Sequence, residues 1–341
     1  MTSPPTSDCR EDSSPIEKQL KLISSPEKGR DTFVNQFPLW RPGARGIFGG
    51  IAIAQSLRAA QATVDDKFHV HSMHCSFIFA GKPDMAITYS VERVRDGRSF
   101  CTRSVRATQH GRPIFIANIS FALPVQATNI VEHAETPPPN VPFVPEVVES
   151  PVKPHGIPSD TPFINKSVGV RSLSSSAGPQ DKRMHQWIKA QGVMPSDTGM
   201  HLAALAFMSD SYFLAAVPHS HEIWHFEHPP VTEFYQTTQD IFSTSTTHSK
   251  VPRPHYDLSP KDPVRPVREV AMMVSLDHTI YFHNQSKLRA DEWLLAEVHT
   301  SWAGESRGLM HQRIWSRDGV LLATCIQEGI VRLGSEKSSR L

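Results

Sequence analysis

The stretch FGGIAIAQSLRAAQATV at residues 48–64, which is followed by HSMHCSFIFAG at 71–81, decides the fold. The first stretch has the apolar spacing of an amphipathic helix that opens on a glycine pair, and the second has the composition of a strand. Further strands are predicted in MAITYSVERVRDGRSFCTRSVRATQ and RPIFIANISFA, with a tight hairpin turn at Asp96-Gly97. One helix followed by long antiparallel strands describes an α+β unit in which a curved sheet wraps a helix.

The same order returns in the second half of the chain. A helix is predicted in GMHLAALAFMSDSYFLAAV, and strands are predicted in VSLDHTIYFH, EWLLAEVHTSWAGE, GLMHQRIWSR and GVLLATCIQEGIVR. HSMHCSF at 71–77 aligns with SLDHTIY at 275–281, an offset of 204, and Gly111 aligns with Gly319, an offset of 208. A nearly constant offset predicts two copies of one unit packed side by side, although two unrelated units with the same element order would give a similar pattern.

Proline-rich and polar segments mark the boundaries between these units. PPPNVPFVPE and SPVKPHGIPSDTP cannot form helices or central strands, so they predict a linker. A stretch rich in Thr, Ser, His and Pro has no counterpart in the first copy and is expected to be a surface insertion. The predicted organisation is a flexible N-terminus (1–30), a first unit (31–123), a Pro-rich linker (124–162), a second unit (163–334) with the insertion at about 219–268, and a tail (335–341).

The composition points to a protein that acts on small molecules. The 35 basic residues nearly balance the 34 acidic ones, so no electrostatic attraction to nucleic acid is expected. The four cysteines have neither a disulfide framework nor a CxxC spacing for zinc, and we expect reduced thiols. Because the N-terminus has no apolar run and no stretch of about 18 apolar residues follows, neither a signal peptide nor a membrane span is predicted.

The last three residues, Ser339, Arg340 and Leu341, are a conservative variant of the Ser-Lys-Leu peroxisomal address. They follow GSEKS, which is small and polar and therefore should leave the tail accessible to an import receptor. The tail predicts a peroxisomal matrix protein.

Asp210 is the first candidate for chemistry. It interrupts the apolar run LAALAFMSDSYFL, where an unpaired carboxylate would cost several kcal/mol. Burial would raise the pKa of this carboxyl toward the range of a general base that works near neutral pH. The alternative is that Ser209-Asp210 only caps or ends a helix.

Ser275 and Gln327 become informative when they are considered together with Asp210. Ser275 opens one predicted strand and Gln327 lies near the end of another, so both side chains can face the helix that carries Asp210. A carboxylate, a hydroxyl and an amide can hold one water from three sides while the carboxylate takes its proton. The backbone N–H groups of Gly49 and Gly50 are candidates for contact with substrate, although the pair can also serve only a tight turn.

Three other motifs carry weaker signals. GESRG matches the G-x-S-x-G elbow, but Ser306 lies between predicted strands and no histidine follows in the required order. HEIWH matches a zinc motif through His221 and His225, but prolines flank it and its setting is the insertion, so no metal site is predicted. Asp66 and His71 have the D-x4-H spacing of hotdog enoyl-CoA hydratases without the surrounding motif, and hydration remains the alternative chemistry.

These motifs resemble the acyl-CoA thioesterase II (TesB-like) family, which includes peroxisomal acyl-CoA thioesterases. Its first hotdog unit is similar to the stretches RGIFGGIAIAQSLRAA, HSMHCSFIFAG and IFIANISFA. Its second unit is similar to MHLAALAFMSD, SLDHTIYFH, SRGL and QEGIVR. The resemblance runs from about residue 45 to residue 332, except for the linker and the insertion. It implies a double hotdog fold, in which each unit is a curved antiparallel sheet wrapping a helix.

The resemblance also implies an activity and a site. In the family, three side chains hold the hydrolytic water: an Asp, a Ser or Thr, and a Gln. The Asp ends the motif that matches AFMSD, the Ser or Thr opens the motif that matches SLDH, and the Gln belongs to the motif that matches QEG. In this sequence these positions are Asp210, Ser275 and Gln327. The implied reaction converts acyl-CoA and water to a fatty acid and CoA, with no cofactor. A binding module that holds acyl-CoA without turnover is the second hypothesis. Because hotdog sheets often pair through their edges, a homo-oligomer is also expected.

Overall fold

The computed structural model describes residues 13–41, 46–124, 131–141, 143, 161–174, 178–221, 223 and 270–334. The predicted tail with its peroxisomal signal, nearly all of the insertion, most of the HEIWH motif and parts of the linker lie outside these residues. Within them, no helix is long and apolar enough to span a lipid bilayer.

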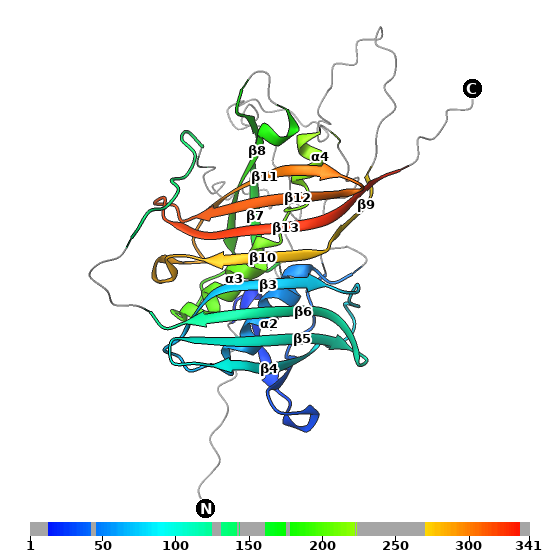
Figure 1. The fold of residues 1–341 in the computed structure, drawn as a ribbon, viewed down its shortest axis with the longest axis vertical. Helices are drawn as coiled ribbons and strands as arrows, with labels where there is room; N and C mark the ends of the chain where they lie inside the picture. Colours follow the sequence, from blue (N-terminus) through cyan, green and yellow to red (C-terminus); the bar gives the residue numbers. More distant parts are fainter. Residues whose placement is uncertain are drawn as a thin grey trace, which may run out of the picture.

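Thirteen strands form one antiparallel sheet, and the two halves of the chain meet at its centre (Figure 1). The strand order is β1-β2-β4-β5-β6-β3-β10-β13-β12-β11-β8-β7, with β9 also paired to β13. The first half supplies β1 (Leu22–Ser24), β2 (Thr32–Asn35), β3 (His69–Phe77), β4 (Thr88–Asp96), β5 (Phe100–Gln109) and β6 (Arg112–Ala122). The second half supplies β7 (Phe163–Ser172), β8 (Lys182–Ala190), β9 (Val270–Ser275), β10 (Asp277–Phe282), β11 (Leu294–Gly304), β12 (Arg307–Trp315) and β13 (Leu321–Leu333).

The pairing of β3 with β10 relates the two halves by an approximate two-fold axis. His74 lies opposite Thr279, and Cys75 lies opposite His278. The offset of 204 found in the sequence makes His74 the counterpart of His278 and Cys75 the counterpart of Thr279. The two-fold axis therefore exchanges the pair His74–Thr279 with the pair His278–Cys75. The sequence therefore predicted correctly that two copies of one unit lie side by side, and the double hotdog fold is confirmed.

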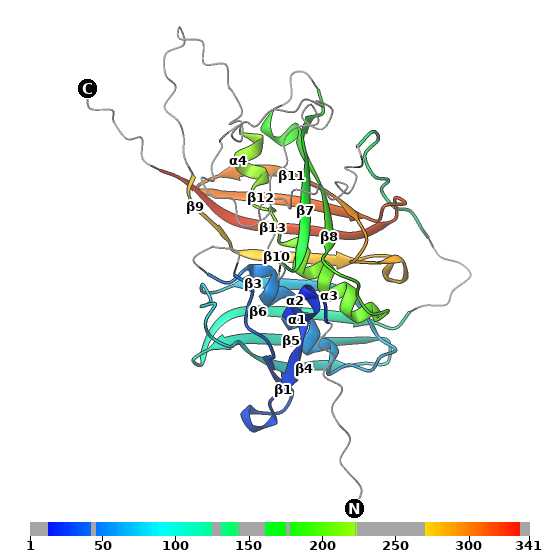
Figure 2. The same ribbon diagram turned by 180° about the vertical axis from the view of Figure 1, so that it is seen from behind.

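Two antiparallel helices, α2 (Gly49–Gln61) and α3 (Thr198–Ser209), lie side by side on one face of the sheet (Figure 2). Nearly every side chain of α3 is buried, and α2 buries Ile51, Ile53 and Leu57 among others. The helices approach closely at Gly50, where a Cβ atom would lie 2.2 Å from the carbonyl oxygen of Phe207. Only glycine allows this approach, which brings the start of α2 against the end of α3.

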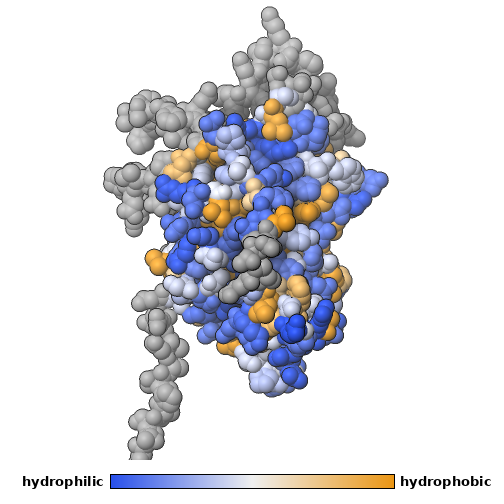
Figure 3. All heavy atoms as spheres, turned by 60° about the vertical axis from the view of Figure 1, so that its left-hand side comes forward, coloured by the Kyte–Doolittle hydropathy of each residue, from blue (hydrophilic) through white to orange (hydrophobic). Residues whose placement is uncertain are grey.

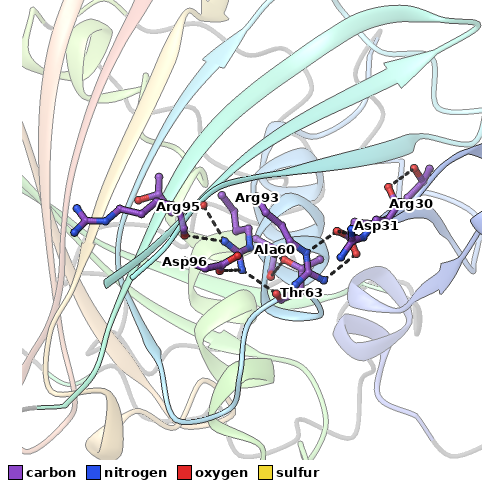
Figure 4. Close-up of polar contacts among 10 residues, drawn as sticks. Arg30, Asp31, Ala60, Thr63, Arg93, Arg95 and Asp96 are labelled. Atoms are coloured by element: carbon purple, nitrogen blue, oxygen red, sulfur yellow. Dashed lines mark hydrogen bonds and ion pairs between the residues drawn. The ribbon is translucent and has the colours of Figure 1, made fainter. Parts of the chain in front are cut away.

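A buried arginine fixes the other end of α2 to the sheet. Arg103 on β5 is 1% exposed, and its guanidinium donates to the hydroxyl (2.9 Å) and the carbonyl (3.0 Å) of Thr63, just beyond α2. It also pairs with Asp96 at the end of β4, close to the more exposed Arg93–Asp31 pair (Figure 4). Because the buried charge has several acceptors, this network holds the end of α2 in place.

The expectation of a flexible N-terminus over residues 1–30 is wrong for the described part, 13–30. Helix α1 (Pro15–Leu20) buries Ile16 and Leu20 completely, and the short 3₁₀ helix η1 (Pro26–Lys28) follows β1. Ser14 and Glu17 form a capping box, and Pro15 occupies the first helical position. The Ser-x-x-Glu spacing with two apolar residues four apart was the signal that could have predicted this helix.

Two elements of the second unit also differ from expectation. Strands β7 and β8, together with the short 3₁₀ helix η2 (Pro179–Asp181), precede α3, whereas the sequence predicted that the unit begins with the helix. The predicted helix over 199–217 is interrupted: α3 ends at Ser209, and a short helix α4 (Ala216–Ser220) follows a turn in which Tyr212 has a φ of 55°. Ser209 is therefore the last residue of α3 and Asp210 is its C-cap, a position that is compatible with both interpretations of Asp210.

The described part of the linker packs on the outer face of the sheet, over the strands of the second half of the chain. Trp187, Trp293, Leu295 and Trp315 form an apolar cluster there, against which Val141 and Phe143 pack. The indole N–H of Trp315 donates to the carbonyl of Glu135 at 2.9 Å. As predicted, the described linker residues form neither helix nor strand, but they cover an apolar surface as well as joining two units.

The described surface is mixed in character. On the face drawn in Figure 3, hydrophobic residues form small patches among hydrophilic ones. Cys75, Cys101 and Cys325 are free and buried.

Candidate active site

Asp210 lies where the end of α3 meets the start of α2. It is the residue that follows the last turn of α3, and the backbone N–H of Gly50 donates to its carboxyl group. A Cβ atom at Gly49 would lie 2.6 Å from Asp210 Oδ2 and 2.9 Å from the ring of Phe77. Gly49 therefore leaves the space that the carboxyl group occupies.

The environment of Asp210 changes its acidity. Burial raises the pKa of Asp210 from 3.8 to about 7, while hydrogen bonds from the Gln327 side chain and the Gly50 backbone act in the opposite direction. The position at the N-terminus of α2 also favours the negative charge. Oδ1 is buried and has no hydrogen-bond partner among the described residues. A carboxyl group with this pKa and a free acceptor oxygen is suited to take a proton from water.

Ser275 and Gln327 lie together because one strand is interrupted. Strands β9 and β10 both pair with β13 and are separated at Leu276, where the Asp277 side chain accepts a hydrogen bond from the Glu328 backbone at 2.8 Å. Ser275 lies opposite Gly329, and Gln327 is the next inward-facing residue of β13. The Gln327 amide donates to Ser275 Oγ at 2.7 Å. Since the same side chain bonds to Asp210, the structure brings the three predicted residues together.

Sequence reasoning missed His278, which makes the other contact of Gln327. Its Nδ1 lies 2.7 Å from Gln327 Oε1, and its Nε2 lies 3.0 Å from Ser209 Oγ. His278 is fully buried and alternates along β10 with the outward-facing Asp277. This alternation in SLDHTIYF was the signal that could have placed His278 toward the helices.

The approximate symmetry creates a second helix junction with different chemistry. At that junction the Gln61 side chain, at the end of α2, donates to the Gly199 carbonyl near the start of α3 at 3.3 Å. The sequence offsets of 204 and 208 place His71 where Ser275 stands and Ile119 where Gln327 stands. At this second junction an amide replaces the carboxylate and the buried alkyl group of Ile119 replaces the Gln327 amide, whereas His71 faces away from the helices, so the three predicted side-chain types come together at the junction at Asp210.

The three weaker motifs lie away from this junction or outside the described residues. Ser306 and Glu305 are the two central residues of the hairpin between β11 and β12, both with positive φ, and this is not a strand-to-helix elbow. His71 bonds to Ser120 at 2.8 Å on the face of the sheet opposite the helices, and Asp66 is exposed. Of HEIWH, only the first and third residues are described.

Comparison with known proteins agrees with this architecture along nearly the whole chain. Two family models match, that of the acyl-CoA thioesterase N-terminal domain over residues 37–122 and that of the C-terminal domain over residues 138–331. Acyl-coenzyme A thioesterase 8 of Homo sapiens is 33% identical over 88% of this chain and 84% of its own length. Peroxisomal acyl-coenzyme A thioester hydrolase 1 of Saccharomyces cerevisiae is 28% identical over 95% and 96% of the two chains.

A solved structure gives the same result in three dimensions. The acyl-CoA thioesterase II TesB2 of Mycobacterium marinum superimposes with a TM-score of 0.65 and 27% identity, covering 94% of this chain and 98% of that one. The sequence resemblance, the paired family models and the fold are thus in agreement: the chain belongs to the acyl-CoA thioesterase II (TesB-like) family.

Proposed function

We propose that this enzyme hydrolyses acyl-CoA thioesters with a water held by Asp210, Ser275 and Gln327. The observation that carries the assignment of residues is the buried carboxyl of Asp210, with a pKa of about 7 and a free Oδ1, bonded to an amide that also reaches Ser275. Family membership supports the reaction, fatty acyl-CoA and water giving a fatty acid and CoA. These side chains supply acid–base chemistry and orientation themselves, and the proposal uses no metal or redox cofactor.

The reaction begins with a water that donates one hydrogen to Asp210 Oδ1. Ser275 and Gln327 orient its oxygen toward the thioester carbonyl, and Asp210 takes the proton as the new C–O bond forms. The tetrahedral intermediate then collapses, the C–S bond breaks, and the proton held by Asp210 passes to the departing CoA sulfur. The carboxylate is thereby restored and the free acid is released.

We assign the thioester carbonyl to the start of α2. Since the Gly50 N–H already donates to Asp210, Gly49 is the member of the pair that we assign to the carbonyl oxygen, whereas Gly50 acts on the substrate only through the carboxylate. The positive end of the α2 dipole favours the charge that develops on that oxygen.

The Asp210→Asn variant should lose about a hundredfold or more in kcat, because an amide cannot accept the proton of the attacking water. The measurement is release of free CoA thiol from acyl-CoAs of short, medium, long and branched chains. Asp65→Asn, which alters an exposed aspartate, is the control and should retain full activity. Normal thiol release by Asp210→Asn would overturn the assignment, and tight acyl-CoA binding without turnover by the wild-type enzyme would support a binding module instead.

The pH dependence of activity and stability should follow the pKa of Asp210. As the carboxylate is the active form, kcat should rise as the pH increases through about 7. The folded state keeps this proton to a higher pH than the unfolded chain, where the pKa is 3.8, so ionisation destabilises the fold as the pH rises from about 4 to 7. Asp210→Asn should therefore raise Tm more at about pH 8 than at about pH 5. Equal shifts in Tm at both values would contradict a raised pKa.

The enzyme is further proposed to act in the peroxisomal matrix. The support is the Ser339-Arg340-Leu341 tail together with the similarity to the yeast enzyme, whose name describes it as peroxisomal.

A fluorescent protein fused to the N-terminus, which leaves the tail free, tests this location. The full chain should colocalise with a peroxisomal marker, and the chain lacking residues 339–341 should remain diffuse, because the import receptor reads those residues. Identical distributions of the two proteins would rule out import through this tail.

A further inference from the structure

His278 connects the proposed site to the end of α3. The side chain is 0% exposed, and its ring lies edge-on to Phe213 with centroids 5.7 Å apart. Its two nitrogens contact Gln327 Oε1 at 2.7 Å and Ser209 Oγ at 3.0 Å. Both contacts are made inside the core, where water cannot replace a missing partner, so the position of each hydrogen matters.

The position of the ring proton follows from the carboxylate of Asp210. A carboxylate only accepts hydrogen bonds, and the Gln327 amide bonds to both Asp210 and Ser275, so its NH₂ group faces those two residues. Its Oε1 must then face His278, which requires a hydrogen on His278 Nδ1.

The second ring nitrogen is consequently an acceptor. Burial lowers the pKa of His278 to about 4, so the ring is neutral near pH 7 and carries one proton. With that proton on Nδ1, Nε2 is an acceptor, so the single hydroxyl hydrogen of Ser209 is shared between Nε2 and the carbonyl of Ala206, to which Ser209 Oγ also donates at 3.0 Å. A chain of donors therefore runs from Ser209 through His278 to Gln327.

The orientation of the Gln327 amide is what this chain of donors decides. The terminal torsion of glutamine is broad and roughly two-fold, so the side chain itself does not select one orientation. If the amide turned over, Oε1 would face the carboxylate of Asp210, and the donor to Ser275 would be lost. A hydrogen on His278 Nδ1 stabilises the orientation in which the NH₂ group serves the site.

We propose that His278 is a positioning residue that holds the amide of Gln327 with its NH₂ group toward Asp210 and Ser275, and that it acts on hydrolysis only through Gln327. This role rests on the proposed functions of Asp210, Ser275 and Gln327. It predicts an effect on the chemical step and little effect on substrate binding, because His278 is buried behind Gln327 and has no access to the acyl-CoA.

Two substitutions at one position separate the donor from the volume of the ring. His278→Leu fills the space without a donor and should lower kcat by about tenfold to a hundredfold, with KM within about twofold of the wild type. His278→Asn places an amide nitrogen near the position of Nδ1, and its kcat should be at least about tenfold higher than that of His278→Leu. A kcat for His278→Leu equal to that of the wild type would overturn the proposal.

A double-mutant cycle tests whether His278 acts through Gln327. In a Gln327→Leu background, His278→Leu should change kcat by less than about threefold, since no amide remains to orient. Independent, multiplicative losses would contradict the proposal, and circular dichroism and Tm of each variant exclude unfolding as the cause. Full activity of Gln327→Leu alone would overturn the proposed triad and this role together, whereas a loss in Gln327→Leu with normal kcat in His278→Leu would overturn only the role of His278.

The tautomer can be measured without any substitution. In ¹⁵N-histidine-labelled wild-type enzyme at about pH 8, where Asp210 is ionised, the ring in contact with Phe213 should be neutral and protonated at Nδ1. A proton on Nε2, or a charged ring at this pH, would contradict the orientation of the amide on which the proposal depends.

Discussion

The carboxyl group of Asp210 lies in the contact between the end of α3 and the start of α2, and the arrangement of the site depends on keeping it there. Burial favours the protonated form, whereas the Gly50 N–H and the positive end of α2 favour the charged form. The opposing effects leave the pKa at about 7, where the group can both take and return a proton. Neither effect would arise without the close approach of the two helices.

Several local features serve this contact. The absence of side-chain atoms at the glycine pair avoids collisions with Asp210 and Phe207, and the end of α3 at Ser209 makes Asp210 the residue that caps the helix. The interruption between β9 and β10 brings Ser275 beside Gln327. The two halves share one architecture and supply two helix junctions, yet only the junction at Asp210 has the carboxylate, so the symmetry provides the framework and the side chains determine the site.

Periodicity in the sequence predicted the long strands well because each has one buried face. Strands β5 and β6 alternate between buried and more exposed residues, whereas α2 is buried on almost every side and was predicted from its apolar residues. Strands β7 and β8 were missed because several of their buried residues are polar, including Asn165 and Gln186, which bond to each other inside the core. Helix α1 was missed because six residues are too few for a periodic pattern, although its capping box was present.

The composition of the site was more predictable than its connections. A carboxylate in an apolar helix pointed to Asp210, and the family resemblance selected Ser275 and Gln327, but no local pattern tells which nitrogen of His278 is protonated or which way an amide faces. Those properties arise from contacts between residues far apart in the chain, such as Ser209 with His278 and His278 with Gln327.

The central claim is that Asp210 activates a water and does not attack the thioester itself. A single turnover in H₂¹⁸O, with enzyme in excess over acyl-CoA, tests it most directly. If the water attacks the carbonyl, the released fatty acid carries one ¹⁸O atom and the carboxylate of Asp210 remains unlabelled. An unlabelled acid, with ¹⁸O found in Asp210 by mass spectrometry of the peptide, would show a covalent acyl-enzyme and contradict the account.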